Sequence, residues 1–151
     1  MPLDLSALER YQKYWVRLMN NNILTIGKRK TATARAVTRK GTGKILINGI
    51  PIELYPIELL RNKLMEPLRI LGDRSNEIDI DVSVQGGGNT GQTDACRTAI
   101  SKGIIKYFKD DELENTFRVY DRTMLVNDIR RKMPKKPMGS GARAKRQKSY
   151  R

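Results

Sequence analysis

The chain has 151 residues and a formal net charge of +14, with no histidine and a single cysteine, Cys96. This composition excludes an internal disulfide and a cysteine-rich metal site, and it removes the commonest general base. No apolar run approaches the roughly 18–20 residues of a membrane span, and the N-terminus lacks the pattern of a signal peptide. We therefore expect a cytoplasmic protein with no membrane partner.

The positive charge is concentrated in two segments on either side of a central region. Residues 23–44 carry seven basic and no acidic side chains, and residues 129–151 carry ten basic and no acidic ones. Residues 45–128 carry ten basic and fourteen acidic side chains, the balance of an ordinary globular domain. Charge this asymmetric indicates a nucleic-acid partner rather than a catalytic pocket.

Residues 1–22 are predicted to be an amphipathic extension. Ser6 and Glu9 have the spacing of a capping box, which marks the start of a helix. Apolar side chains recur there at helical spacing: Leu5, Leu8, Trp15 and Leu18. Such a helix could pack on the domain, dock on a partner or have no role, and the sequence leaves these alternatives open.

Residues 23–48 have the pattern of strands and turns. The cations Lys28, Arg29 and Lys30 follow Gly27 in a predicted loop, where they would contact phosphates without reading bases. Residues 31–38 place an alanine at every second position, as in a half-buried strand. A glycine-containing turn and the apolar residues 44–48 follow, so these two strands are predicted to form a hairpin.

A helix is predicted after the tight turn at Asn48-Gly49. Pro56 suits the first helical position, where its missing amide costs nothing. Pro67 is expected to end or kink the helix near Met65. The apolar face follows helical spacing: Ile57, Leu60, Leu64, Leu68 and Leu71.

The cleanest strand pattern lies at residues 78–85, where Ile or Val alternates with polar residues. The helix that follows has a narrow side that can lie close to a sheet, made of Ala95, Ala99 and Gly103. A shorter helix is predicted near Asp110, with three apolar anchors: Leu113, Phe117 and Tyr120.

The glycine run at residues 85–92 lies between that strand and helix. Glycines let a ligand approach the backbone, and free amides at a helix start attract phosphate. The run lacks the Lys-Ser/Thr ending of a nucleotide loop, since Gln92 and Thr93 follow Gly91. We favour contact with an RNA backbone, and a tight turn required only by the fold is the alternative.

No catalytic constellation is predicted. Asp79 and Asp81 share one strand face, but a solvent-facing strand explains them better than an acid–base pair. No Ser/His or Cys/His pair can exist without histidine. The sequence therefore predicts a protein that is not an enzyme and has no cofactor and no metal site.

These elements predict an α+β fold, a two-layer sandwich of a mixed β-sheet with helices packed on it, plus a long extended C-terminal tail. The predicted organisation is an extension (1–22), a globular RNA-binding domain (23–128) and a basic tail (129–151). The tail combines prolines, glycines and ten cations without apolar periodicity, so it is expected to be disordered alone and to condense on a polyanion.

Several motifs together resemble the universal ninth protein family of the small ribosomal subunit. They are the segment from Gly27 to Ala32, Asn48-Gly49, the glycines from Gly86 to Gly91 with Gln92, and the ending Lys148-Ser149-Tyr150-Arg151. The segment from Tyr120 to Asp128 and the last eleven residues are similar to the archaeal and eukaryotic branch of that family. The resemblance covers residues 26–151, and Met19 would also begin a family-like chain.

The resemblance implies the α/β sandwich of the second domain of the fifth small-subunit protein, with a left-handed crossover. It implies a place in the subunit head, beside neighbouring head proteins and bound to the 3′ domain of the rRNA. The implied rRNA contacts are Lys28, Arg29, Lys30, Arg35, Gly86, Gly87, Gly88, Gln92, Arg130, Arg131, Lys132, Lys135, Lys136, Arg143, Lys145 and Arg146.

The same resemblance implies that the tail reaches the peptidyl-site tRNA. The implied tRNA contacts are Lys148, Tyr150 and Arg151, and an extended tail of 23 residues spans on the order of 75–80 Å. Two other classes stay open: a free-standing non-specific RNA-binding protein or RNA chaperone, and a nuclease with a basic arm. The absence of histidine counts against the nuclease.

Overall fold

The structure is a computed structural model that describes residues 22–144 and residue 149. The predicted N-terminal helix lies outside the described residues. So do five of the predicted RNA-contact residues, namely Lys145, Arg146, Lys148, Tyr150 and Arg151.

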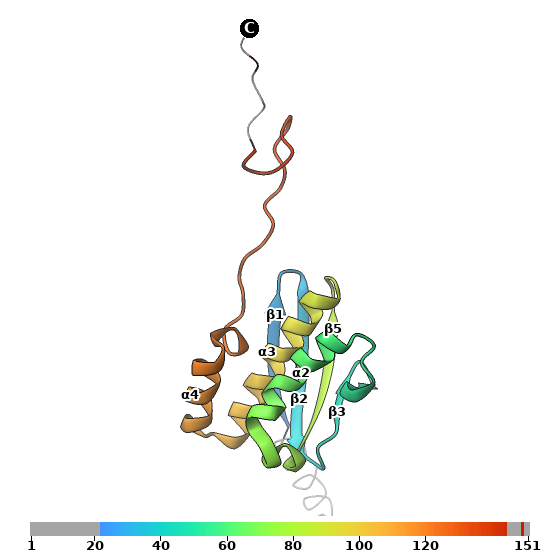
Figure 1. Ribbon diagram of the computed structural model, residues 1–151, viewed down its shortest axis with the longest axis vertical. Helices are drawn as coiled ribbons and strands as arrows, with labels where there is room; N and C mark the ends of the chain where they lie inside the picture. The colour runs from blue at the N-terminus through green and yellow to red at the C-terminus, as the bar shows by residue number, and fades with distance from the viewer. Residues whose placement is uncertain (1–21, 145–148, 150–151) are drawn as a thin grey trace, which may run out of the picture.

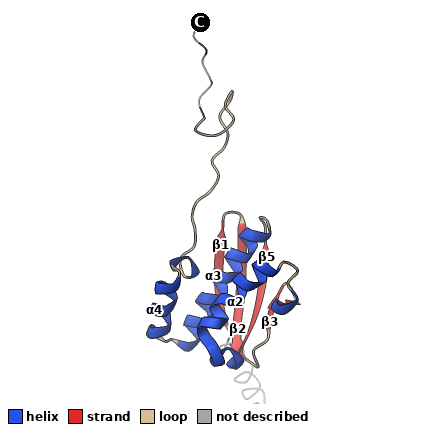
Figure 2. Cartoon of the chain, in the orientation of Figure 1, coloured by secondary structure: helices blue, strands red, loops and turns tan. Residues whose placement is uncertain are grey.

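A mixed sheet of five strands forms one layer of the domain in the order β1-β2-β5-β3-β4. The strands are β1 (Ile23–Arg29), β2 (Ala32–Lys40), β3 (Ile45–Ile47), β4 (Ile50–Pro51) and β5 (Ile78–Gln85). All neighbouring pairs are antiparallel except β3 and β5, which are parallel. As Figures 1 and 2 show, the helices lie on one face of this sheet, which confirms the predicted two-layer α+β sandwich.

The predicted hairpin between residues 31–38 and 44–48 is wrong. β2 pairs with β1 on one side and with β5 on the other, and β3 pairs with β5 and β4. The hairpin partner of β2 is β1, so the segment from Gly27 to Arg29 lies inside a strand rather than in a loop. β5 therefore lies between β2 and β3, and the alanine face of β2 is fully buried in the interior of the sheet.

Three α-helices are present in the described part of the chain: α2 (Glu58–Leu71), α3 (Asn89–Phe108) and α4 (Asp111–Tyr120). The short 3₁₀ helices are η1 (Ile52–Leu54), η2 (Gly72–Glu77) and η3 (Arg122–Met124). In Figure 1 the chain leaves β3, passes through α2 in front of the sheet and returns to β5 on the left. Parallel strands joined in this way make a left-handed crossover, which is rare and agrees with the family resemblance.

Two details of α2 differ from the sequence prediction. The helix begins at Glu58 with Ile57 as its N-cap, so Pro56 precedes the helix instead of opening it. Pro67 does not end the helix, which continues to Leu71. Pro67, Leu68 and Leu71 are buried in the core, and this burial compensates for the backbone hydrogen bond that proline cannot make.

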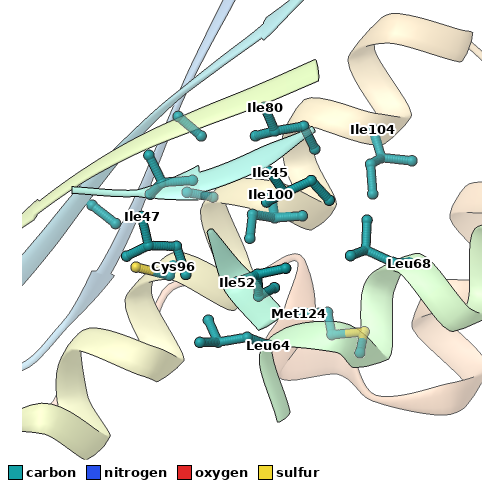
Figure 3. Packing of buried hydrophobic residues seen from close by; sticks show 14 of the residues in the cluster. Ile45, Ile47, Ile52, Leu64, Leu68, Ile80, Cys96, Ile100, Ile104 and Met124 are labelled. Carbon is teal, nitrogen blue, oxygen red and sulfur yellow. The ribbon is translucent and has the colours of Figure 1, made fainter. Parts of the chain in front are cut away.

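The core lies between the sheet and the helices. The alternating residues of β2 and β5 face α3, and the predicted leucines of α2 from Leu60 to Leu71 are buried, whereas Ile57 is exposed. Figure 3 shows the centre of this packing, where Ile45 and Ile80 from the sheet lie beside Ile100 from α3, and Leu64 from α2 lies near Ile52. α4 adds Leu113 and Phe117 to the core, but Tyr120 is 58% exposed and is not an anchor.

Within the described residues, no helix is long and apolar enough to cross a membrane. This part of the chain also contains no cluster of His, Cys, Asp and Glu side chains that could hold a metal ion.

Candidate nucleic-acid interface

The predicted RNA-contact elements meet at one end of the domain. Figure 1 shows the β1–β2 turn, the start of α3 and the point where the C-terminal segment leaves the domain at the same end, drawn at the top. A hollow of about 300 Å³ lies between the turn and the glycine run, lined by Lys30, Thr31, Gly87 and Gly88, among others. Distant parts of the sequence thus form one continuous surface.

The alternation of side chains along β1 decides on which face of the sheet the cations of the first basic segment lie. In β1 the side chains of Leu24, Ile26 and Lys28 point to the face without helices, where they are exposed. Thr25, Gly27 and Arg29 point to the opposite face, toward α3. Lys28 and Arg29 are neighbours in sequence but lie on different sides of the sheet.

Lys28 and Lys30 are exposed, and neither forms an ion pair with a carboxylate among the described residues. Lys30 occupies the turn in a left-handed conformation with φ 55°. A lysine whose charge has no protein partner is suited to bind a phosphate.

Arg29 differs from Lys28 and Lys30 in its surroundings, although the sequence predicted a phosphate contact for all three. Its Nε lies 3.4 Å from a carboxylate oxygen of Asp94 in α3, and its Nη1 pairs with Asp128, just before the tail. Lys63 in α2 lies 2.5 Å from the other oxygen of Asp94. Arg29 thus has two carboxylate partners within the domain, unlike Lys28 and Lys30.

The first glycines of the glycine run adopt a backbone conformation and a close packing that favour glycine. Gly86 and Gly87 have φ values of 79° and 70°, and a Cβ at Gly86 would lie 2.6 Å from the carbonyl oxygen of Thr31. Gln92 donates a hydrogen bond from Nε2 to the carbonyl oxygen of Gly86, at 3.2 Å, and this bond stabilises the turn. The backbone of this turn therefore favours glycine at both positions.

Gly88 is the N-cap of α3 and has no side chain to cap the helix. No acidic residue lies in the first turn of α3. Asp94 follows in the second turn, where its carboxylate pairs with Lys63 and Arg29. The positive end of a long helix thus faces the hollow beside Lys30.

Arg35 lies farther along β2, exposed on the face without helices. Its cross-strand neighbours are Ile26 and Ser83. The structure thus separates Arg35 from the glycine run but keeps it on the same sheet face as Lys28.

A second charged cavity, of about 310 Å³, lies next to Arg29 and is lined by five basic and four acidic side chains. Arg97 of α3 is only 6% exposed, and its guanidinium lies 2.5 Å from Glu66 and 2.7 Å from Asp121. Burial works to raise the pKa of Asp121, but hydrogen bonds from Thr123 and Arg97 outweigh it and lower that pKa. This network, in which one guanidinium pairs with two carboxylates, joins α2, α3 and η3. Sequence reasoning missed it because its members are far apart in the chain.

The tail begins at the same end of the domain and runs away from it as an irregular chain (Figure 1). All the predicted tail contacts that the structure describes are exposed: Arg130, Arg131, Lys132, Lys135, Lys136 and Arg143. Among these, Arg130 binds the carboxylate of Asp128 through its guanidinium, with Nη2 at 2.7 Å from Oδ2.

Comparison with known proteins gives a consistent result. The model of the family described as ribosomal protein S9/S16 matches residues 27–151. A protein of Picrophilus torridus named small ribosomal subunit protein uS9 is 74% identical over 133 residues, which cover 88% of this chain and all of that protein. Proteins of the same name from Thermoplasma volcanium and Halobacterium salinarum are 63% and 51% identical, over 85% and 84% of this chain and 98% and 97% of their own lengths.

Proposed function

The chain belongs to the ribosomal protein S9/S16 family and is therefore a structural protein of the ribosome rather than an enzyme, and we propose that it binds rRNA with the basic end of its domain. It is assigned to the small subunit because its relatives carry the name of a small-subunit protein. By the family resemblance, the site is the 3′ domain of the rRNA in the subunit head, beside neighbouring head proteins.

One observation supports this proposal most directly. Lys30, in the turn between β1 and β2, and the uncapped start of α3 line one hollow. Lys28 is exposed on the other face of the same end of the sheet, and the root of a tail with ten cations lies at this end too. Phosphate groups are the ligands that lysine side chains and helix N-termini share. The contacts proposed from the domain are Lys28, Lys30, Arg35, Gly87 and Gly88, while Arg29, Gly86 and Gln92 act on the fold.

The tail is the second part of the proposal. Its basic residues up to Arg146 line the rRNA, and Lys148, Tyr150 and Arg151 contact the tRNA in the peptidyl site. The support is the composition of residues 129–151, which contain no acidic side chain, together with the position at which residue 129 leaves the basic end of the domain.

Charge removal in matched pairs tests the domain contacts. The variant Lys28→Gln/Lys30→Asn removes two cations at the basic end, and Lys106→Gln/Lys109→Asn removes two exposed cations at the other end of α3. Lys30 and Lys109 have matched left-handed conformations, with φ 55° and 51°, and asparagine tolerates both. The first pair should lower the slope of log affinity for rRNA against log salt by about 1.4–1.8, and the second should leave it unchanged. Equal slopes for the two pairs would remove the basic end from the interface.

The alternative is a free-standing protein that coats RNA without specificity. Sedimentation separates the two functions. A structural component stays with small subunits through a high-salt wash, whereas a coating protein dissociates because its binding is mainly electrostatic. Retention in the washed subunit, with protection of 3′-domain rRNA in a footprint, is the expected result.

A further inference from the structure

The root of the tail is attached to the edge of the sheet. Asp128 forms an isolated parallel β-bridge with Arg29 at the end of β1, which is otherwise an edge strand of the sheet. Just before it, Asn127 accepts a hydrogen bond at Oδ1 from the backbone amide of Lys28, at 3.2 Å. The chain therefore adds a short strand segment to the sheet immediately before its basic residues begin.

A side chain from α3 also holds Asn127. Lys102 of α3 donates from Nζ to Oδ1 of Asn127, at 2.9 Å, and to the carbonyl oxygen of Ile26, at 3.2 Å. Burial, and then the nearby charge of Lys106, lower the pKa of Lys102. Asn127 is thus fixed to both layers of the domain.

The carboxylate of Asp128 joins the domain to the first tail cation. Its side chain is only 16% exposed. It pairs with Arg29 on the sheet side and accepts hydrogen bonds from the backbone amide and the guanidinium of Arg130 on the tail side. Arg130 therefore starts the tail in a direction fixed by Arg29.

We propose that Asn127 and Asp128 are positioning residues: together with Arg29 and Lys102 they form a clamp that sets the direction in which the tail leaves the domain. The clamp rests on the proposed function, because its benefit arises when the tail binds RNA. A tail whose root is held in one direction has fewer orientations to lose on binding, so its cations reach their phosphates at a higher effective concentration. This role also accounts for the pairing of Arg29, within a run of cations, with Asp128.

The direct test measures the direction of the tail in the isolated full-length protein. Spin labels are attached to cysteines introduced at Ser83→Cys on β5 and Met133→Cys in the tail, both at exposed positions. The native Cys96 is buried and burial raises its pKa to about 12, so it does not compete for the label. Asp128→Asn should at least double the width of the distance distribution. The matched control Glu114→Gln, which removes the exposed ion pair with Arg118, should leave the width unchanged.

An unchanged width in Asp128→Asn would overturn the clamp, whatever the protein binds. A double-mutant cycle, which combines Asp128→Asn with truncation of the tail, then tests whether the clamp contributes to rRNA binding. Asp128→Asn should weaken rRNA binding by about threefold to tenfold in the full chain, and by less than twofold in a chain cut after Met133. Equal losses in the two chains would show that Asp128 supports only the domain and would overturn the positioning role. If the cut itself leaves rRNA affinity unchanged, the proposed function of the tail fails, while the label distances still report on the clamp.

Discussion

Gly27 in β1 lies directly against the backbone of α3 at Ala99: a Cβ at Gly27 would lie 2.7 Å from the amide nitrogen of Ala99. A few residues away, the hydroxyl of Thr25 donates to the carbonyl oxygen of Ala99, at 2.7 Å. The close approach of strand and helix at this point places Arg29 within reach of Asp94, and so determines which cations of the basic segment remain free.

Gly27→Ala should therefore destabilise the domain. The added methyl meets backbone atoms of α3, which cannot rotate away as a side chain can, so overpacking should cost about 1–3 kcal/mol. This corresponds to a fall in melting temperature of roughly 5–15 °C, measurable by circular dichroism. Gly91→Ala is the control, because a Cβ there makes only ordinary contacts at 3.8 Å, and its melting temperature should be unchanged or higher. A Gly27→Ala protein as stable as the wild type would show that strand and helix can separate.

Acid should weaken the turn that leads into β3. Asp79 Oδ1 accepts hydrogen bonds from the amides of Thr42 and Lys44, at 2.8 and 2.9 Å, and these bonds lower the pKa of Asp79 below that of an ordinary aspartate. A lowered pKa in the folded state means that the stabilisation is complete above the unfolded value and is lost as pH falls through the folded one.

Asp79→Asn should therefore cost about 1 kcal/mol at pH 7, a value discounted for solvent exposure, and much less near pH 2. Urea denaturation at both pH values measures the difference. Because Asp110 and Asp121 also have lowered pKa values, the wild-type domain as a whole should lose stability on acidification. A difference between wild type and variant that does not depend on pH would contradict this assignment.

Cutting the tail after Met133 should change the salt dependence of rRNA binding. The cut removes seven basic residues: Lys135, Lys136, Arg143, Lys145, Arg146, Lys148 and Arg151. If most of them contact phosphates, the slope of log affinity against log salt should decrease by about 5–6, since each neutralised phosphate contributes roughly 0.7–0.9. Filter binding over a series of salt concentrations measures the slope. The same slope for the cut and the full-length chain would place the tail away from RNA.

Deletion of Arg151 alone separates tRNA contact from assembly. A guanidinium can form two hydrogen bonds with a phosphate, which lysine cannot reproduce. Loss of this contact should weaken retention of peptidyl-site tRNA by about 1.5–3 kcal/mol at most, with a normal yield of subunits. Dissociation rates of tRNA from purified subunits measure the effect. Identical rates with and without Arg151 would leave the tail as an rRNA contact only.

A chain that starts at Met19 should assemble into subunits as the full chain does. The family model begins at residue 27, and the relative from Picrophilus torridus is covered completely by an alignment over 133 residues, so the remaining N-terminal residues of this chain have no counterpart there. Incorporation of both chains into subunits in competition measures any difference. Preferential incorporation of the full chain would show that residues 1–18 make a contact in the subunit.

The sequence by itself determined the local features of this protein. Alternation in residues 31–38 and 78–85 identified the buried faces of β2 and β5, because neighbouring side chains of a strand point to opposite sides. Asn48-Gly49 identified the turn between β3 and β4, since both residues adopt positive φ values, 49° and 81°. The small residues of α3 correctly indicated close packing on the sheet, and composition alone separated the basic tail from the domain.

Tertiary structure decided which of these features meet. β2 pairs with β1 and β5 rather than with β3, because strand pairing depends on non-local burial that no short pattern encodes. Pro67 stays inside α2 because the helix around it is buried. Lys28 and Arg29 are adjacent cations that cannot be told apart in the sequence. Asp94 and Asp128, both distant in sequence, nevertheless pair only with Arg29. The charge of a residue can be read from the sequence, but whether that charge remains free for RNA depends on which carboxylates the fold brings to it.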